Sequence, residues 1–577
     1  MITSPHKVLI ANRGEIAVRI IRACQDYGAK AVAVYADPDA EALHVDMADE
    51  AWALPGISPA DTYLNIDALL DIARRSGATM VHPGYGFLSE RAEFARAVQA
   101  AGLIWVGPEP ETIENLGDKV QARKIAMAVG APLVKGTPGP VSGAAEVLDF
   151  VATHGLPVAI KAAFGGGGRG LKVVWRQDEV EELYHSAVRE AQTAFGRSEC
   201  YVEQYLDCPR HIEAQVIADK HGSVVVLGTR DCSLQRRNQK LVEEAPAPFI
   251  SDVLRQKIHD SARDICARAG YIGAGTVEFL LSRDGTLSFL EVNTRLQVEH
   301  PVTEETTGLD IVIEQLRIAE GLPLSIQEMP KPRGHSFEFR INAEDAGKGY
   351  LPTPGTITHF RAPSGPGIRF DSGVRAGSTI PGSYDSLMAK LIVTGSTREQ
   401  AIVRARRALC EFEIEGVASV LPFHRAVMVE PDFTEQFAVH TRWIETDFAE
   451  RIEFAPRQTP KPDEVLLRHW IELDGRRVQL GLPAKLFSGL APIPSNDKGN
   501  ISSTTPINET NIEAPISGVF HSWIVEEGKS VREGEVIAVM EAMKMEVQVM
   551  AHRAGLLKQH VEKGKALEVG SSLGEIV

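Results

Sequence analysis

The stretch that organises this chain lies near its C-terminus and reads Val539-Met540-Glu541-Ala542-Met543-Lys544-Met545-Glu546-Val547. Short runs rich in β-branched and apolar residues flank it on both sides, and both predict strands. The segment Ala-Met-Lys-Met is then the tip of a β-hairpin, with the Lys544 ammonium in water. The alternative is an ordinary surface lysine on a hairpin.

An internal repeat surrounds this hairpin. The segment Gly528 to Gly534 reads GKSVREG and recurs as GKALEVG at Gly564 to Gly570, and an apolar pair precedes each copy. Two similar β units with a lysine hairpin between them predict a small two-fold flattened barrel. This pattern resembles biotinyl and lipoyl carrier domains, and the alanine and methionines are typical of the biotin version. The resemblance implies covalent biotin on Lys544, and the rest of the chain should then load the biotin or unload it.

Length and composition bound the remaining possibilities. The chain has 577 residues, enough for three or four domains, and a net charge of −16 argues against nucleic acid or an anionic membrane as partner. Six cysteines without Cys-x-x-Cys spacing predict reduced thiols, neither a disulfide framework nor a zinc site. The N-terminus lacks a signal peptide's apolar segment and no apolar run is long enough to span a bilayer, so we expect a cytoplasmic protein.

The N-terminal part predicts a parallel α/β domain. An apolar strand at 7–11 precedes a helix ended by Gly28, and a second strand follows at 31–35. The dinucleotide fingerprint Gly-x-Gly-x-x-Gly is absent, so no dinucleotide site is predicted. The loop from His82 to Phe87 follows another strand and is either a ligand loop or a structural turn.

A glycine-rich segment lies between two predicted strands. It runs from Leu156 to Val174 and contains Phe164-Gly165-Gly166-Gly167-Gly168-Arg169-Gly170. Glycines let backbone N–H groups turn toward an anion, although the Walker signature is missing. Because Lys161 precedes the loop, the interpretation is a phosphate-binding flap; the alternative is a flexible turn.

Carboxylates interrupt two apolar strands further on. Glu278 lies in one strand and Glu291 in the next, with Asn293 two positions later on the same face. Asp284-Gly285 predicts the turn that pairs them as a hairpin. Three oxygen ligands on one surface suit Mg²⁺, whereas a structural salt bridge is the alternative.

The basic run from Arg230 to Lys240 precedes Glu243-Glu244 and is either a solvated face or an anion site. Taken in order, the polar residues resemble biotin carboxylase, of the ATP-grasp superfamily, from Ile10-Ala11-Asn12-Arg13-Gly14-Glu15 to about residue 447. Joined to the carrier, the whole resembles the α subunit of an acetyl/propionyl-CoA carboxylase, an enzyme of fatty acid biosynthesis. The motifs that carry the resemblance are Lys119, Lys161 with its glycine loop, Glu203 to Leu206, His211, Gln235 to Lys240, Glu278, and Glu291-Val292-Asn293-Thr294-Arg295.

The resemblance implies an α/β plus all-β architecture in successive parts. They are an N-terminal parallel α/β domain (1–115), an α+β ATP-grasp domain (116–333) with a mobile glycine-rich lid (about 133–204), a carboxylase C-terminal domain (334–447), a short hairpin region (448–487), a flexible linker (488–512), and a flattened β-barrel biotinyl domain (513–577).

The same resemblance implies the roles of individual residues. ATP is held by Lys119, Lys161, Gly167, Gly168, Glu203, Leu206, His211 and Gln235. Mg²⁺ or Mn²⁺ is held by Glu278, Glu291 and Asn293. Bicarbonate is bound by Lys240, Arg295, Gln297 and Val298, with Glu299 as its base, and Arg340 stabilises the enolate of biotin.

The implied chemistry is the ATP-dependent formation of carboxyphosphate from bicarbonate. It collapses to CO₂ and phosphate, and the phosphate takes the proton from the ureido nitrogen of biotin. Two departures from the family stand out: Asn238 replaces a histidine, and Phe164 replaces a glycine of the flap. Neither touches the proposed chemistry.

About 60 residues are left for anything else, too few for an acyl-CoA-binding transferase. The partner is therefore expected to be a separate carboxyltransferase β subunit in a hetero-oligomer, with acyl-CoA bound through it, and a biotin protein ligase is expected to attach the biotin. Asp474-Gly475 predicts a hairpin at 465–481, which we expect to dock this partner. The Pro-, Ser- and Asn-rich linker has an r.m.s. span of about 25–30 Å, and roughly 85 Å when extended.

Three functions remain open from the sequence. The first is the biotin-loading subunit of an acyl-CoA carboxylase. The second is the same half-reaction for another acceptor, such as a branched acyl-CoA or urea. The third is a non-catalytic carrier scaffold with an inactive ATP-grasp domain, which the complete residue set disfavours.

We predict that Lys544 is the single biotinylated residue, because it alone lies in Ala-Met-Lys-Met at a hairpin tip. Avidin detection or intact mass of Lys544→Arg should show no biotin, whereas Lys565→Arg, in the second copy of the repeat, should retain it. Biotin on the Lys544→Arg protein would refute the assignment.

Overall fold

The computed structural model describes residues 5–163, 171–449, 466–473, 476–483, 510–516, 518–542, 545–567 and 569–577. The chain divides into two compact units, one comprising Met1–Glu344 and Pro352–Glu453 and the other Asp345–Leu351 and Phe454–Val577. Among the described residues, no helix combines the length and the apolar character needed to cross a membrane.

A five-stranded parallel sheet opens the first unit. Its strand order is β3-β2-β1-β4-β5, and β1 pairs with both β2 and β4. The predicted βαβ unit is confirmed, and its helix ends where Gly28 adopts a φ of 80°, which glycine tolerates without strain. The elements are β1 (Lys7–Ile10), α1 (Gly14–Tyr27), β2 (Lys30–Ala36), α2 (Leu43–Met47), β3 (Glu50–Leu54), α3 (Ile66–Ser76), β4 (Met80–His82), α4 (Ala92–Ala100), β5 (Ile104–Trp105) and α5 (Pro110–Gly117).

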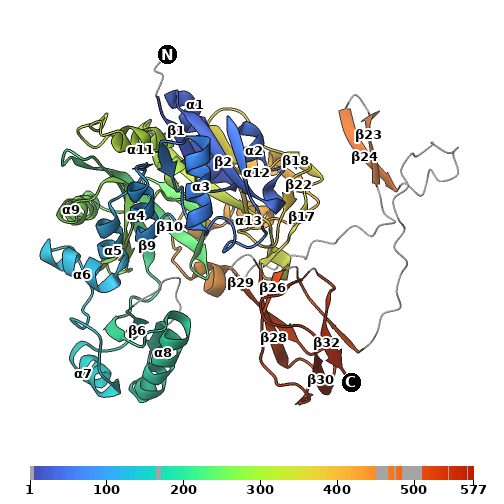
Figure 1. Cartoon of the computed structure of the whole chain (residues 1–577). Helices are drawn as coiled ribbons and strands as arrows, with labels where there is room; N and C mark the ends of the chain where they lie inside the picture. The colour runs from blue at the N-terminus through green and yellow to red at the C-terminus, as the bar shows by residue number, and fades with distance from the viewer. Residues whose placement is uncertain are drawn as a thin grey trace. The chain divides into compact units, whose positions relative to one another are not determined.

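A small lobe carries the glycine-rich segment. Strands β6 (Val158–Ala162), β7 (Leu171–Val174) and β8 (Cys200–Gln204) form an antiparallel sheet in the order β7-β6-β8, and the lobe also holds α7 (Ala144–His154) and α8 (Val180–Phe195) (Figure 1). The two strands predicted on either side of the glycines are confirmed. The loop between them, with Gly167 and Gly168, lies outside the described residues. Mobility of this lobe stays a prediction.

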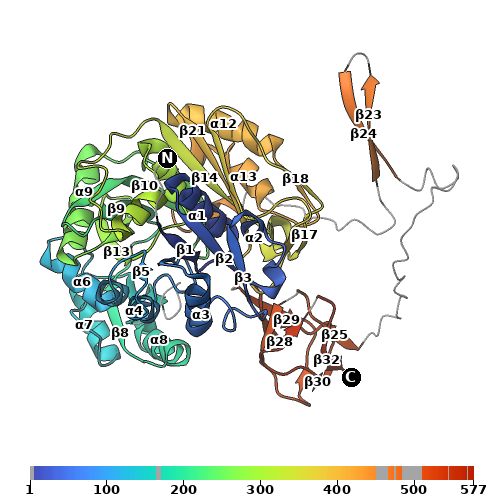
Figure 2. The same ribbon diagram turned by 45° about the horizontal axis from the view of Figure 1, so that its top comes forward.

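An eight-stranded sheet in the order β13-β12-β9-β10-β11-β14-β21-β19 is the centre of the first unit (Figure 2). Pairing of β11 with β14 joins the expected ATP-grasp and C-terminal regions into one hydrogen-bonded surface, which the sequence did not predict. The strands are β9 (Arg210–Ala218), β10 (Val224–Arg236), β11 (Gln239–Ala245), β12 (Gly273–Leu281), β13 (Leu287–Asn293), β14 (His335–Asn342), β19 (Ile368–Ser372) and β21 (Leu387–Gly395).

Helices complete this unit, and apolar side chains of several of them enter its cores. They are α6 (Lys119–Ala128), α9 (Asp252–Arg268), α10 (His300–Thr307), α11 (Ile311–Ala319), α12 (Arg398–Glu411), α13 (Leu421–Val427) and α14 (Pro431–Thr434). Helix α6 is capped at its start, since the Asp118 carboxylate accepts hydrogen bonds from the amides of Val120 and Gln121. Short ladders join β17 (Gly355–Thr356) to β20 (Thr379–Ile380) and β18 (His359–Arg361) to β22 (Glu413–Glu415).

The C-terminal unit contains two four-stranded antiparallel sheets with the orders β25-β32-β30-β27 and β29-β28-β26-β31. The orders correspond strand for strand under the sequence repeat, but each copy gives two strands, β25 and β27 or β29 and β31, to the other copy's sheet. The predicted two-fold barrel is confirmed. Its strands are β25 (Asn511–Glu513), β26 (Gly518–Trp523), β27 (Ser530–Val531), β28 (Val536–Ala542), β29 (Met545–Met550), β30 (Gly555–Gln559), β31 (Ala566–Leu567) and β32 (Ser572–Ile576).

The lysine hairpin has the expected register, because Ala542 at the end of β28 pairs with Met545 at the start of β29. Met543 and Lys544, which connect them, lie outside the described residues. A separate antiparallel hairpin pairs β23 (Leu466–Leu473) with β24 (Arg476–Pro483), as predicted from Asp474-Gly475.

Candidate active site

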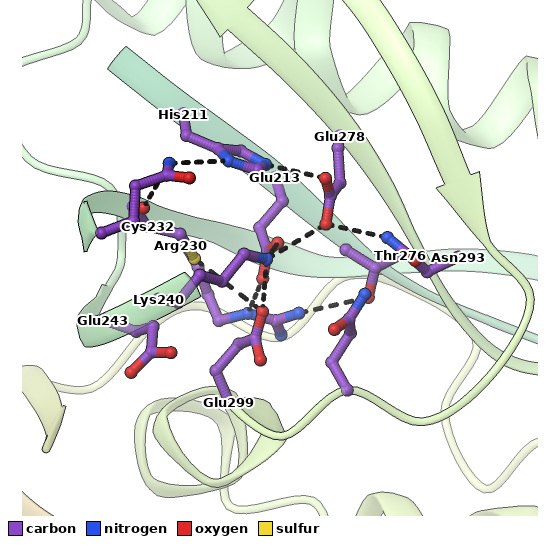
Figure 3. Close-up of polar contacts among 12 residues, drawn as sticks. His211, Glu213, Arg230, Cys232, Lys240, Glu243, Thr276, Glu278, Asn293 and Glu299 are labelled. Carbon is purple, nitrogen blue, oxygen red and sulfur yellow. Dashed lines mark hydrogen bonds and ion pairs between the residues drawn. The ribbon is translucent and has the colours of Figure 1, made fainter. Parts of the chain in front are cut away.

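A partly buried ammonium group, that of Lys240, is the centre of the polar cluster on the eight-stranded sheet (Figure 3). Lys240 Nζ donates to three carboxylates: Glu213 Oε2 at 2.7 Å, Glu278 Oε1 at 3.0 Å and Glu299 Oε1 at 2.6 Å. All three carboxylates are buried, so each needs a cation or a proton to remain in the core.

Charge–charge contacts set the protonation of this cluster. Burial alone would lower the pKa of Lys240, but the surrounding carboxylates raise it well above its usual value. Burial likewise opposes ionisation of Glu213, yet Lys240 and Arg230 lower its pKa to about 2. The pKa of Glu299 is also lowered despite burial, with Lys240 as the main cause. Glu299 is therefore an anion at neutral pH, as a general base must be.

Arg230 is a second cation that pairs with Glu213. The guanidinium of Arg230 is fully buried and donates to Glu213 Oε1 at 2.6 Å, and it also contacts Gln215, Thr276 and Thr303. These contacts hold Glu213 between two cations. The Glu213 carboxylate therefore holds Lys240 in position and does not serve as a ligand-binding group.

The expected metal ligands occupy adjacent strands. Glu278 on β12 lies directly opposite Glu291 on β13, and Asn293 Nδ2 donates to Glu278 Oε1 at 2.8 Å. His211 Nε2 lies 2.8 Å from Glu278 Oε2. Burial and the neighbouring Glu278 raise the pKa of Glu291. Two apposed carboxyls and an amide form a hard oxygen donor set that fits Mg²⁺ or Mn²⁺, and a divalent cation would relieve their repulsion.

A second pair of contacts joins Glu299 to the C-terminal half of the sheet. Arg340 Nη2 donates to Glu299 Oε2 at 2.9 Å, and Arg340 Nε donates to Glu243 Oε1 at 2.6 Å. Glu299 thus receives Lys240 on one oxygen and Arg340 on the other. The expected base and the expected oxyanion donor are in direct contact across the β11–β14 junction.

The loop before α10 presents the remaining expected residues. Arg295 donates to Gln297 Oε1 at 3.0 Å, to Asn293 Oδ1 at 3.3 Å and to Glu90 Oε2 at 2.8 Å. The buried ammonium of Lys390 donates to the carbonyl of Val298 at 2.9 Å, which fixes the backbone beside Glu299.

The residues expected to bind nucleotide approach from the lobe, from α6 and from β9–β10. Lys161 forms an ion pair with Glu203, whose other oxygen lies 3.3 Å from Arg123 Nη1. At the start of α6, Lys119 Nζ is 3.9 Å from Glu291 Oε2. Gln235 Nε2 is 3.3 Å from His211 Nδ1, whereas Leu206, partly exposed, follows β8.

Sequence reasoning assigned no role to Glu90, Glu213 and Lys390, and it gave Arg230 and Glu243 only as part of a run that was either a solvated face or an anion site. One signal was present, since His211, Glu213 and Gln215 alternate with apolar residues along β9 and so share one face of the sheet. No comparable sequence pattern marks Lys390, because the residues that it contacts, Glu15 and Val298, are far from it in the sequence. Of the basic run, Lys240 enters the cluster, whereas Arg237 and Asn238 are exposed at the β10–β11 turn.

Four family descriptions match successive segments of the chain. They are "Biotin carboxylase, N-terminal domain" over 4–113, "Carbamoyl-phosphate synthase L chain, ATP binding domain" over 118–327, "Biotin carboxylase C-terminal domain" over 338–446, and "Biotin-requiring enzyme" over 510–576.

Three known proteins illustrate the similarity. A biotin-dependent acyl-coenzyme A carboxylase alpha3 subunit of Mycobacterium leprae is 55% identical over 99% of this chain and 98% of its own. The Campylobacter jejuni biotin carboxylase β,γ-ATP complex has a TM-score of 0.74 at 40% identity, over 76% of this chain and 98% of its own. The Hydrogenobacter thermophilus 2-oxoglutarate carboxylase biotin carboxylase domain, solved with MgADP, ADP and bicarbonate, has a TM-score of 0.73 at 44% identity, over 77% and 98% respectively.

We predict that Lys240→Met destabilises the first unit by about 3–5 kcal/mol at pH 8, because it leaves three buried carboxylates with too few cations. Without Lys240 their folded-state pKa values rise above the unfolded values, so the loss should shrink as the pH falls toward 5.5. Denaturant unfolding at both pH values measures this. The control Lys257→Met, on an exposed turn of α9, should change stability little at either pH. Equal losses at both pH values would contradict the assignment of charge.

Proposed function

The chain belongs to the family of biotin-dependent carboxylases, as a biotin carboxylase joined to its own biotin carrier, and we propose that it is the α subunit of an acyl-CoA carboxylase. Its own reaction is the ATP- and bicarbonate-dependent carboxylation of biotin. The observation that carries the proposal for the site is the position of Glu299 between Lys240 and Arg340.

Glu299 is the proposed base for bicarbonate. Its two oxygens already accept from Lys240 and Arg340, which keeps the carboxylate ionised and orients it. Bicarbonate bound by Lys240, Arg295, Gln297 and the Val298 backbone would give its proton to Glu299. Its oxygen then attacks the γ-phosphorus of ATP, which releases ADP and forms carboxyphosphate.

Arg340 is the proposed partner of the ureido oxygen of biotin. When carboxyphosphate breaks down to CO₂ and phosphate, the phosphate accepts the ureido N–H proton and negative charge develops on that oxygen. A preorganised guanidinium stabilises this charge without reorganisation. Arg340 engages Glu243 through Nε and Glu299 through Nη2, so its remaining N–H groups can donate to that oxygen.

The nucleotide roles are proposed from the family resemblance and the positions of the side chains. Lys161, Glu203, Leu206, His211 and Gln235 lie on or beside β6 and β8–β10, and Lys119 opens α6 toward Glu291. Gly167 and Gly168 are proposed to cover the phosphates. Mg²⁺ or Mn²⁺ would be held by Glu278, Glu291 and Asn293, and when bound it neutralises phosphate charge.

The acceptor is proposed from the similarity over the whole chain. Residues 5–449 resemble carboxylases of more than one acceptor, including a 2-oxoglutarate carboxylase, so the biotin carboxylase part does not specify it. Similarity to the Mycobacterium leprae acyl-coenzyme A carboxylase subunit extends over nearly the full chain, including the segment between carboxylase and carrier. This favours an acyl-CoA, carboxylated by a separate transferase subunit, over urea, and among acyl-CoA substrates we propose acetyl- or propionyl-CoA.

We predict that Arg340→Gln separates ATP cleavage from biotin carboxylation. Loss of one donor to a developing oxyanion typically slows a reaction about a hundredfold to a thousandfold. Bicarbonate activation precedes that step, so some bicarbonate-dependent ATP cleavage should remain, and the ratio of phosphate released to free biotin carboxylated should rise strongly.

The matched variant is Glu299→Gln, which removes the base from the same contact. ATP cleavage and biotin carboxylation should then fall together. If Arg340→Gln instead reduces both activities equally, Arg340 serves nucleotide binding or folding and its proposed role is wrong.

The β23–β24 hairpin is the proposed docking element for the transferase subunit, since it lies between two modules that need no such insert. We predict that deletion of residues 466–483 spares ATP cleavage with free biotin but reduces co-purification with the transferase. Deletion of 488–505, which has the same length and leaves the hairpin intact, is the control. Co-purification that survives the hairpin deletion would contradict the docking role, and an acyl-CoA panel on the intact complex identifies the acceptor.

A further inference from the structure

Glu338, a buried residue close to Arg340, has no role in the reaction described above. Glu338 lies on β14 two residues before Arg340, so the two side chains share one face of the sheet. Its side chain is fully buried at 0% exposure, and neither carboxyl oxygen has a hydrogen-bond partner within the described residues. An ionised carboxylate in that position would be strongly unfavourable.

The nearby cations are already engaged by other acids. Arg340 donates to Glu243 and Glu299, as described above. Lys390 forms an ion pair with Glu15 at 2.9 Å and donates to a backbone carbonyl. The ionised form of Glu338 therefore lacks a dedicated counter-ion.

The residue directly opposite Glu338 in the β11–β14 ladder is Glu243. Facing residues in an antiparallel pair have Cβ atoms about 4.5–5.5 Å apart, which brings their carboxyl groups within reach. Glu243 uses Oε1 to accept from Arg340, whereas its Oε2 is buried and unpartnered. Two acids on adjacent strands thus present unsatisfied oxygens to the same side of the sheet.

We propose that Glu338 and Glu243 share one proton, with the neutral carboxylic acid of Glu338 donating to Glu243 Oε2. This hydrogen bond satisfies both side chains and leaves the pair with a single negative charge. Glu243 Oε1 remains free to hold Arg340. Glu338 is thus a positioning residue that acts through Glu243 on Arg340 and does not touch substrate.

The electrostatics agree with this geometry. Burial raises the pKa of Glu338 well above its ordinary value, and the nearby Glu243 and Glu299 raise it further, against Lys390 and Arg340. Burial also raises the pKa of Glu243, to about 7. The charged and titratable groups that act on the pair are Arg340 of β14, Lys390 of β21, Lys240 of β11, Cys232 of β10, Glu299, and Tyr85, whose hydroxyl donates to Glu15.

The shared proton keeps Arg340 available for biotin. With both acids ionised, a second negative charge would bind the guanidinium more tightly and would raise the proton affinity of Glu299. With one proton held, Arg340 faces one charge from the pair and one from Glu299. This step rests on the role proposed for Arg340, whereas the presence of the proton does not.

The variant Glu338→Gln tests the proton directly, because its amide can donate the same hydrogen bond but cannot ionise. In the wild type the folded pKa of Glu338 exceeds the unfolded value, so stability falls as pH rises between the two. The Glu338→Gln variant cannot ionise at this position, so it does not lose stability in this way as the pH rises. Its apparent Tm should exceed that of the wild type by about 1–3 °C at pH 8 and by less at pH 6.

The control is Glu304→Gln. Glu304 is also a buried glutamate, but its ion pairs with Arg19 and Arg369 keep it ionised. The substitution should lower the Tm at pH 8. Infrared difference spectra should show a protonated carboxyl band in the wild type at neutral pH that Glu338→Gln lacks and Glu304→Gln retains. If Glu338→Gln fails to fold, Glu243→Gln replaces the acceptor of the Glu338 proton with an amide oxygen, so the band should shift in frequency, and an unshifted band would overturn the pairing. A lower Tm for Glu338→Gln together with an unchanged band would overturn the shared proton.

The link to Arg340 has its own readout. In the wild type the ratio of phosphate released to free biotin carboxylated should rise at alkaline pH as the pair loses its proton, and in Glu338→Gln the ratio should stay constant over that range. Loss of the infrared band without any difference in this pH profile would overturn the positioning role. Failure of the Arg340→Gln experiment alone would instead count against the function proposed for the arginine.

Discussion

The Lys240 ammonium is the interaction on which the site depends. It lies among three buried carboxylates from β9, β12 and the loop before α10, and it donates a hydrogen bond to each of them. Because an uncompensated buried charge is so unfavourable, the packing of these three elements is more stable at neutral pH with the ammonium in place. The same contacts keep Glu278 and Glu299 ionised, so the requirement that stabilises the fold also prepares a metal ligand and a base.

Charge is arranged in a graded manner across the eight-stranded sheet. At the β12–β13 edge, apposed carboxyls form an acidic surface suited to a divalent cation. Lys240 and Arg230 balance the acids in the middle, and beyond β11 the arginine and acids of β14 follow. The substrates differ in charge: a nucleotide with its metal, bicarbonate, and the nearly neutral ureido ring of biotin. Each would therefore meet a different local electrostatic field, a short distance from the others. Hydrogen-bonded strands fix the distances between these fields.

Much of this could be predicted from the sequence where the signal is local. The β12–β13 hairpin with Glu278, Glu291 and Asn293 on one surface follows from strand periodicity and a turn. The carrier barrel follows from a repeat. The support for Glu299 could not be predicted in this way, because Arg340 and Lys390 come from strands far away in the chain. The β11–β14 pairing that brings them together has no local signature, since ladder contacts depend on tertiary packing.

The carrier barrel has a further consequence through the exchange of its short strands. Strand β27 of the first repeat completes the sheet of the second, and β31 of the second completes that of the first. Neither half has a closed set of backbone partners by itself, so an isolated half would expose sheet edges. During synthesis the β28–β29 hairpin emerges before β31 and β32 exist. An enzyme that attaches the prosthetic group only to the folded barrel would therefore act only after β31 and β32 have been made. Attachment of the prosthetic group would then show that this part of the chain has been synthesised and has folded.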